Sequence, residues 1–274
     1  MRLKTVPAQR GALWVRLGFR AFFKRPMAFA ALFAAFMFIV FVLALLPYLG
    51  PLLLLALLPL VSLAFMLATR AVVGGGLPTP LVFIAPLRAA SPRVRSLLWL
   101  GLIYAVATFA VMWLSELVDD GAFEALMGSM PATPGGAPDA LGDKFAAPGL
   151  LWGMVLRFGL AGLLAIPFWH APALVYWDGQ GWAQAMFSST LACWRNRGAF
   201  IVYALTWFSL ILGFGILMSV LFALIGSPQL FALAGVPISL LATTVFYASL
   251  YFTFADCFSD IEPDPQVEPS AGTV

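Results

Sequence analysis

The chain has 274 residues, of which 62% are hydrophobic and only 10% are charged, with a formal net charge of +3 and a mean hydropathy of +0.98. Soluble domains carry roughly 25% charged residues, so this composition argues against a soluble domain. It predicts an all-α polytopic membrane protein with about six transmembrane helices and additional interfacial amphipathic helices.

Residues 1–26 are predicted to form a cytoplasmic, basic amphipathic helix. Its charged side chains Arg16, Arg20 and Lys24 repeat every four residues, and Trp14 lies on another face with its apolar neighbours. Such a helix normally lies in the headgroup layer and attracts anionic lipid. The alternative is a docking surface for a partner protein.

Residues 27–255 are predicted to form a six-helix transmembrane domain. A span needs roughly 20 apolar residues, and two stretches with no charged side chain, Pro26–Thr69 and Gly198–Ala255, each hold two spans. Turns at "LPYLGP" (Leu46–Pro51) and "IGSPQ" (Ile225–Gln229) divide these stretches. The predicted spans are Met27–Leu46, Leu52–Thr69, Ser96–Ser115, a fourth between Leu150 and Trp177, Phe200–Leu224 and Leu230–Phe254.

The basic residues predict the orientation of the spans. Thirteen of the 15 Lys and Arg residues precede the first span or lie in the connections after the second and fourth; Lys144 and Arg157 lie toward the opposite face. Because Lys and Arg accumulate on the cytoplasmic side, we expect both termini to be cytoplasmic in a bacterial inner membrane. The acidic segment 116–149 then forms a periplasmic loop, with a short helix at Ala122–Met127. The acidic tail 256–274 is predicted to be disordered.

The fourth span has two alternative registers. In the first, Gly149–Phe168, Arg157 lies near the bilayer centre and His170 at the cytoplasmic interface. In the second, Phe158–Val175, Arg157 lies near the outer boundary and His170 lies within the hydrocarbon. A charged side chain at the centre costs roughly 2.5–3.5 kcal/mol on insertion scales. We therefore favour the second register, as one long helix kinked near Pro167 and Pro172 and ending at Asp178.

A second amphipathic segment, Gly181–Phe200, precedes the fifth span. Trp182 and Trp194 lie with Phe187 on one helical face, and Arg195 and Arg197 mark the interface. Both amphipathic segments place a basic pair and "AF" before a two-span hairpin, which hints at an internal repeat. We expect Arg16, Arg20, Lys24, Trp182, Trp194, Arg195 and Arg197 to contact lipid or a partner.

A candidate intramembrane polar site contains Arg157, His170 and Thr108. His170, the only histidine, is either a proton-relay or ligand residue or a hydrogen-bonded histidine beside a proline kink. Arg157 is either an outer-leaflet residue or a counter-charge for an anionic substrate or for Glu116.

Motifs for catalysis or cofactor binding are missing from the sequence. "VVGGGLP" (Val72–Pro78) lacks the Gly-Lys-Ser/Thr of a phosphate-binding loop, and one histidine makes metal or hydrolytic catalysis improbable. Cys193 and Cys257 form no CxxC motif, and both are placed on the reducing cytoplasmic side. We therefore expect no enzyme activity, no cofactor, no metal site and no nucleic-acid partner.

The chain resembles a proteobacterial, mainly betaproteobacterial, family of six-span inner-membrane proteins of unknown function. The resemblance is carried by "PALV" (Pro172–Val175), Gly181, "AQAMFSS" with Ala185 and Ser188, "CWRNRGAF" (Cys193–Phe200) and "LPYLGP". A looser similarity extends to the membrane domain of some glycerophosphodiester phosphodiesterases, but no catalytic domain of theirs is present. The family implies a topology and no mechanism.

Two main hypotheses of function follow. The first is a non-catalytic scaffold, assembly factor or lipid-organising protein that contacts anionic headgroups, a membrane-protein partner or further copies of itself. The alternative is a permease or channel for a small, anionic solute that uses Arg157. A weaker third is a lipid-modifying enzyme using His170 and Asp178, although eight residues on a continuous helix separate them by about 80° and about 12 Å.

Overall fold

The computed structural model describes residues 1–129, 149–226 and 229–258. Within these ranges, six helical segments are long and apolar enough to cross a membrane, which confirms the all-α polytopic fold class. They are α2 (Pro26–Ala44), α3 (Leu49–Val73), α4 (Ser91–Asp119), the kinked segment Leu150–Asp178, α10 (Arg197–Leu224) and α11 (Gln229–Cys257), the last spanning over Pro237–Cys257.

Several boundaries differ from the predicted ones. Helix α4 continues past Ser115 and includes Asp119, and α11 continues past Phe254 and includes Asp256, so both acidic residues belong to helices. The predicted acidic tail therefore begins later, and its remainder, 259–274, lies outside the described residues. Segment 116–149 contains α5 (Ala122–Ser129) at the predicted short helix, while its middle, 130–148, is also outside the described residues.

The fourth span forms one long kinked helix, as the sequence predicts, while the register of its membrane-crossing part stays a prediction. It consists of α7 (Leu150–Phe168), the turn α8 (Ala171–Ala173) and the π-helical turn η3 (Leu174–Asp178). The remaining elements are α1 (Arg10–Lys24), the 3₁₀ turns η1 (Pro80–Phe83) and η2 (Ala85–Arg88), and α9 (Trp182–Arg195).

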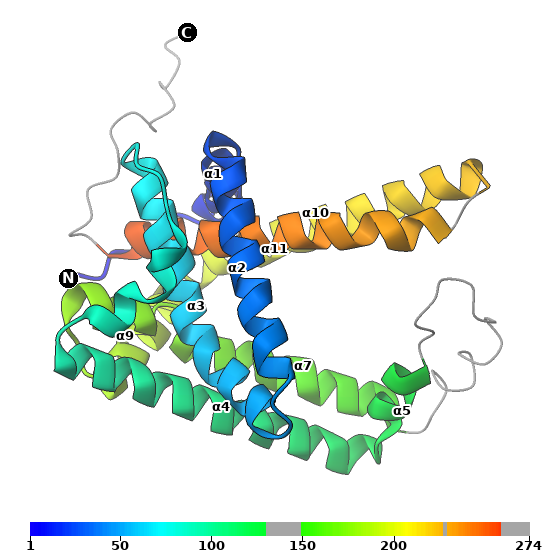
Figure 1. The fold of residues 1–274 in the computed structure, drawn as a ribbon, viewed down its shortest axis with the longest axis horizontal. Coiled ribbons are helices and arrows are strands. Elements are labelled where there is room, and N and C mark those ends of the chain that lie inside the picture. Colours follow the sequence, from blue (N-terminus) through cyan, green and yellow to red (C-terminus); the bar gives the residue numbers. More distant parts are fainter. Residues whose placement is uncertain (130–148, 227–228, 259–274) are drawn as a thin grey trace, which may run out of the picture.

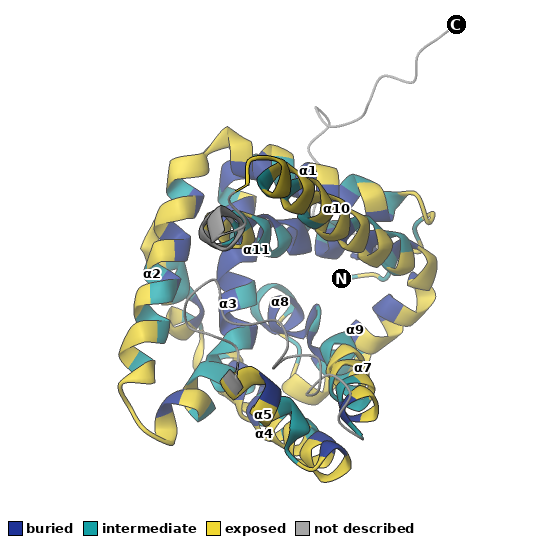
Figure 2. Cartoon of the chain, turned by 90° about the vertical axis from the view of Figure 1, so that its right-hand side faces the viewer, coloured by how far each residue is buried: buried dark blue, intermediate teal, exposed yellow. Residues whose placement is uncertain are grey.

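The spans are arranged as two long pairs with a hairpin between them. Helices α4 and α7 lie side by side and form one pair, and α10 and α11 form the second pair, called the α10–α11 arm. The α2–α3 hairpin lies between the two pairs, and its helices cross the directions of both (Figure 1). Figure 2 shows the same arrangement from the end, with α4, α10 and α11 viewed along their axes and α2 and α3 viewed from the side. Helix α3 contacts α4 on one side and α11 on the other, so it joins the two pairs.

Helix α1 packs against α10 and α11, far from it in sequence. A Cβ atom on Gly11 would overlap the carbonyl oxygen of Ala199, and one on Gly18 would lie 2.7 Å from the Cβ of Ser249. Glycine at these two positions lets the helix backbones approach closely, as small residues do between membrane helices. Consequently the apolar face of α1, with Trp14 and Phe22, is buried inside the protein.

The two amphipathic helices of the predicted internal repeat, α1 and α9, do not pack in the same way. Helix α1 contacts the second hairpin, α10 and α11, whereas α9 contacts α7, α8 and α4. The buried face of α9 consists of small side chains, namely Ala185, Ser189, Ala192 and Cys193. The two amphipathic helices therefore have different roles in the fold.

The two ends of the described chain meet on one side of the molecule. Leu3 forms an antiparallel bridge with Phe258, and the backbone N–H of Lys4 donates to the carbonyl of Cys257 at 2.8 Å. The N-terminal segment thus lies against the end of α11.

Candidate functional site

The kink in the fourth span is stabilised by a side chain from another helix. In a regular helix the N–H of His170 would donate to the carbonyl of Ile166, four residues earlier. Instead it donates to Oγ of Ser189 on α9 at 3.0 Å, and that hydroxyl donates to the Ile166 carbonyl at 2.9 Å. The Ser189 hydroxyl is therefore inserted into one helical hydrogen bond beside Pro167, a recognised cause of a sharp kink.

His170 is completely buried directly after this kink. Its Nε2 lies 3.1 Å from Oγ1 of Thr253, which donates to the Leu250 carbonyl and accepts from Nε1 of Trp169. Because the single hydroxyl proton of Thr253 is directed at Leu250, the hydrogen-bond pattern assigns the imidazole proton to Nε2. Nδ1 then carries a lone pair that has no hydrogen-bond partner in the described part of the chain.

Aromatic rings enclose the imidazole of His170. Phe200, Phe254 and Phe258 lie edge-on to it, with ring centroids 5.5–5.9 Å away. Asp178 is not close: its carboxylate binds the amino group of Met1 at 2.8 Å and Nε2 of Gln180 at 2.8 Å. The structure therefore does not bring the His170 and Asp178 of the enzyme hypothesis together.

Asn196, buried between α9 and α10, holds the N-terminal segment in place. Its Oδ1 accepts from the N–H of Val6 at 2.8 Å, and its Nδ2 donates to the carbonyls of Lys4 and Ala192. A single amide side chain thus links residues 1–6 to the junction between the two helices.

A second link joins α1 to the end of α11. The guanidinium of Arg10 binds both carboxylate oxygens of Asp256 at 2.8 Å, and Nε1 of Trp14 donates to the same carboxylate at 2.6 Å. Such bidentate, charge-assisted bonds are the stronger class of hydrogen bond. They fix the position of α1 along α11.

Arg157 pairs with Asp119, whereas Glu116 was one of the alternative partners left open by the sequence. The guanidinium lies 3.6 Å from the Asp119 carboxylate and 4.0 Å from the ring centroid of Phe123, while Glu116 is exposed. Gly153 makes room for this pair, since a Cβ there would overlap the Asp119 side chain. The charge of Arg157 is thus compensated within the protein.

Thr108, the third residue of the candidate polar site, bonds only within its own helix in the interactions observed: its Oγ1 donates to the carbonyl of Tyr104 at 2.8 Å. Arg157 bonds at the α4–α7 contact and His170 bonds to α11. The structure therefore places the three residues in separate environments.

The interfacial residues predicted from the sequence lie at the surface. Arg16, Arg20 and Lys24 on α1 are exposed, as are Trp182, Trp194 and Arg195 on α9 and Arg197 at the start of α10. Arg197 lies over the ring of Trp194, 5.7 Å from its centroid. The α9 aromatic face is defined as the large exposed side chains of this helix: Trp182, Phe187, Leu191 and Trp194. Phe187 and Trp194 are each 69% exposed, and Trp182 and Leu191 are each 39% exposed.

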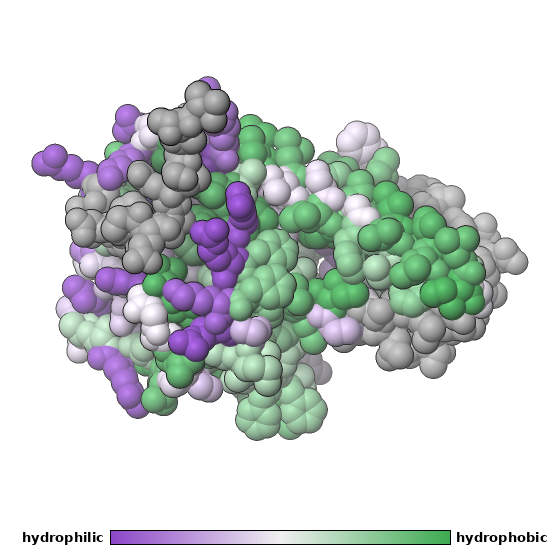
Figure 3. All heavy atoms as spheres, turned by 90° about the horizontal axis from the view of Figure 1, so that it is seen from above, coloured by the Kyte–Doolittle hydropathy of each residue, from purple (hydrophilic) through white to green (hydrophobic). Residues whose placement is uncertain are grey.

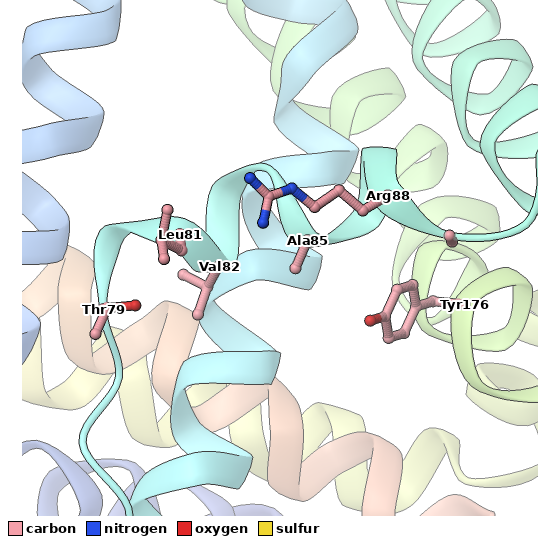
Figure 4. Close-up of a pocket in the computed structure, with 7 residues that line it drawn as sticks. Thr79, Leu81, Val82, Ala85, Arg88 and Tyr176 are labelled. Atoms are coloured by element: carbon pink, nitrogen blue, oxygen red, sulfur yellow. The ribbon is translucent and has the colours of Figure 1, made fainter.

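A shallow hollow of about 410 Å³ lies between η1, η2 and η3. Arg88 extends along one side and the hydroxyl of Tyr176 points toward it from the other (Figure 4).

The described residues include no group of three or more His, Cys, Asp or Glu that could hold a metal ion. The polar groups of the kink are mostly paired with one another, so they serve to hold helices together.

Comparison with known proteins gives one strong relative. A Burkholderia thailandensis protein named a probable inner membrane protein is 34% identical over 264 residues, which cover 96% of each chain. The chain belongs to this family of inner membrane proteins. No protein-family model and no solved structure matches it. The resemblance read from the sequence is confirmed, whereas the looser similarity to glycerophosphodiester phosphodiesterases is not shown.

Sequence reasoning missed the partners of this inner membrane protein's buried polar groups. Ser189, Thr253, Asp119 and Asp256 each bond to a residue on another helix. Ser189 gave a weak signal, because it lies among the small side chains of α9 and away from Phe187 and Trp194. Asp119 and Asp256 lie just outside the predicted spans, where an exposed carboxylate is expected and does not indicate a contact with another helix.

Proposed function

We propose that this inner membrane protein is a non-catalytic scaffold, with both termini in the cytoplasm, that binds a partner through the α9 aromatic face. The observation that carries the proposal is the contrast within α9: its small side chains are buried and its large aromatic side chains are exposed. Aromatic and Arg side chains are enriched at protein interfaces and at membrane–water boundaries. Arg195 at the end of α9 and Arg197 at the start of α10 agree with a position on the cytoplasmic side.

The polar groups support binding rather than catalysis. His170 is enclosed by rings and bonded through Nε2, so it has no path to a substrate among the described residues. The Asp119–Arg157 pair disfavours the alternative of an anion permease, because it compensates the charge that would attract the anion.

The test is purification of the tagged full chain in mild detergent after in-cell cross-linking. We expect a co-purified partner that is lost when Trp182 and Trp194 are both changed to Ser. A matched control changes Trp113 and Trp152, which are also exposed. Trp113 lies near the C-terminal end of α4, and Trp152 lies near the N-terminal end of α7. The control should keep the partner. Purification of the wild-type chain alone, or equal loss in both variants, would refute the scaffold role.

A further inference from the structure

An apolar groove lies between α10 and α11, next to α1. Its volume is about 720 Å³, and it extends from Trp207 and Phe246 at one end to Met218 and Gly235 at the other. This distance covers 11 residues of helix, roughly 16 Å. The groove begins where Phe19 of α1 stacks on Trp207, with ring centroids 5.9 Å apart.

The groove lies along the part of α10 that follows its buried residues. The buried residues of α10 are Ala199, Tyr203 and Trp207, all near its start. A Cβ atom on either Gly215 or Gly235 would meet no atom within 4 Å. Because water is excluded from the hydrocarbon core of a bilayer, we expect an apolar occupant in this space.

Trp207 forms the wall at the end of the groove beside α1. It is only 7% exposed, and its buried Nε1 lies beside the Tyr203 side chain.

Positive charge lies beside the same end of the groove. Arg16 and Arg20 are exposed on α1 and flank Phe19, and residues three apart on a helix are neighbours on its surface. Figure 3 shows that hydrophilic side chains gather toward this end of the molecule, whereas hydrophobic side chains cover the α10–α11 arm. An occupant with an anionic head and a hydrocarbon tail matches this arrangement.

The volume of the groove selects among apolar occupants. At about 720 Å³ the groove has the size of a site for one small ligand. Pockets of roughly 300–1,000 Å³ are typical of small-molecule sites.

We propose that the groove binds one acyl chain of an anionic glycerophospholipid, whose headgroup contacts Arg16 and Arg20. This site is separate from the α9 aromatic face. The lipid site and the scaffold role can therefore fail independently.

The test is titration of the delipidated full chain in detergent with phosphatidylglycerol and with phosphatidylcholine, followed by native mass spectrometry. Gly215→Leu fills the groove. Gly213→Leu is the matched control, because Gly213 is on the same helix, does not line the groove and also has free space for a Cβ. Both changes favour helix formation, so both variants should fold.

We expect the wild-type chain and Gly213→Leu to bind one phosphatidylglycerol with equal affinity, and Gly215→Leu to lose it. Changing Arg16 and Arg20 to Gln should abolish the preference for phosphatidylglycerol. Equal binding by Gly215→Leu and Gly213→Leu, equal binding of both lipids by the wild type, or a dimer that excludes lipid from the groove would overturn the proposal.

Discussion

Helices α1 and α9 have similar sequence patterns and opposite surroundings. Each is amphipathic, basic near its end and followed by a two-span hairpin. Trp14 of α1 is fully buried against α10 and α11, while Trp194 of α9 is 69% exposed. Amphipathic periodicity reveals that a helix has an apolar face, and it does not reveal whether that face meets protein, lipid or a partner.

The small residues explain the difference. Gly11 and Gly18 let the backbone of α1 approach α10 and α11 so closely that its aromatic side chains fill the space beside them. In α9 the small residues Ala185, Ser189 and Ala192 form the buried face, and the aromatic side chains are left on the outside. The position of the small residues, rather than of the large ones, thus identifies the side that packs.

The largest expected effect follows from closing the space beneath α1. Gly11→Leu would overlap the backbone of α10, so we expect α1 to separate and little folded protein to be recovered. Ala12→Leu, one residue along at an exposed position, should behave as wild type. Size-exclusion chromatography of detergent extracts distinguishes the two, and equal recovery would mean that α1 is not tightly docked.

Asp256→Asn tests the polar contact that fixes α1. The change removes the charge that holds Arg10 and weakens the bond to Trp14, so we expect a loss of about 2 kcal/mol. The control is Asp120→Asn, at an exposed position. Thermal unfolding in mild detergent measures both, and a similar small effect of the two would contradict the assigned role of Asp256.

Ser189→Ala tests how α9 is attached. Without the hydroxyl, the N–H of His170 and the carbonyl of Ile166 lose their shared partner, at a cost of about 1–2 kcal/mol. Ser188→Ala removes the same group from the neighbouring position, which is only half-buried, and should have little effect. Unfolding in chemical denaturant compares them; a larger effect at Ser188 would show that the kink does not depend on α9.

Cys193 gives the smallest, purely chemical test. Burial raises the pKa of its thiol to about 12, so the thiol stays protonated and unreactive at neutral pH. A maleimide should label Trp194→Cys quickly and the native Cys193 slowly, as read by mass spectrometry at pH 7.5. Rapid labelling of Cys193 would mean that the small-residue face of α9 is open.

Much of the fold could be predicted because it depends on local properties of the chain. The six spans follow from runs of apolar residues, and the kink follows from Pro167 and Pro172. The docking of α1 could not be predicted, since its contact with Asp256 joins residues 246 apart. The same holds for the Asp119–Arg157 pair and for the groove beside Trp207, which depend on how separate helices meet.

The most direct test of the contrast between α1 and α9 is the thermal stability of Trp14→Ala and Trp194→Ala in the same detergent. The account predicts that Trp14→Ala loses about 3–5 kcal/mol, as is usual for a buried aromatic side chain, and that Trp194→Ala stays within about 0.5 kcal/mol of wild type. Equal losses, or a larger loss for Trp194→Ala, would contradict it.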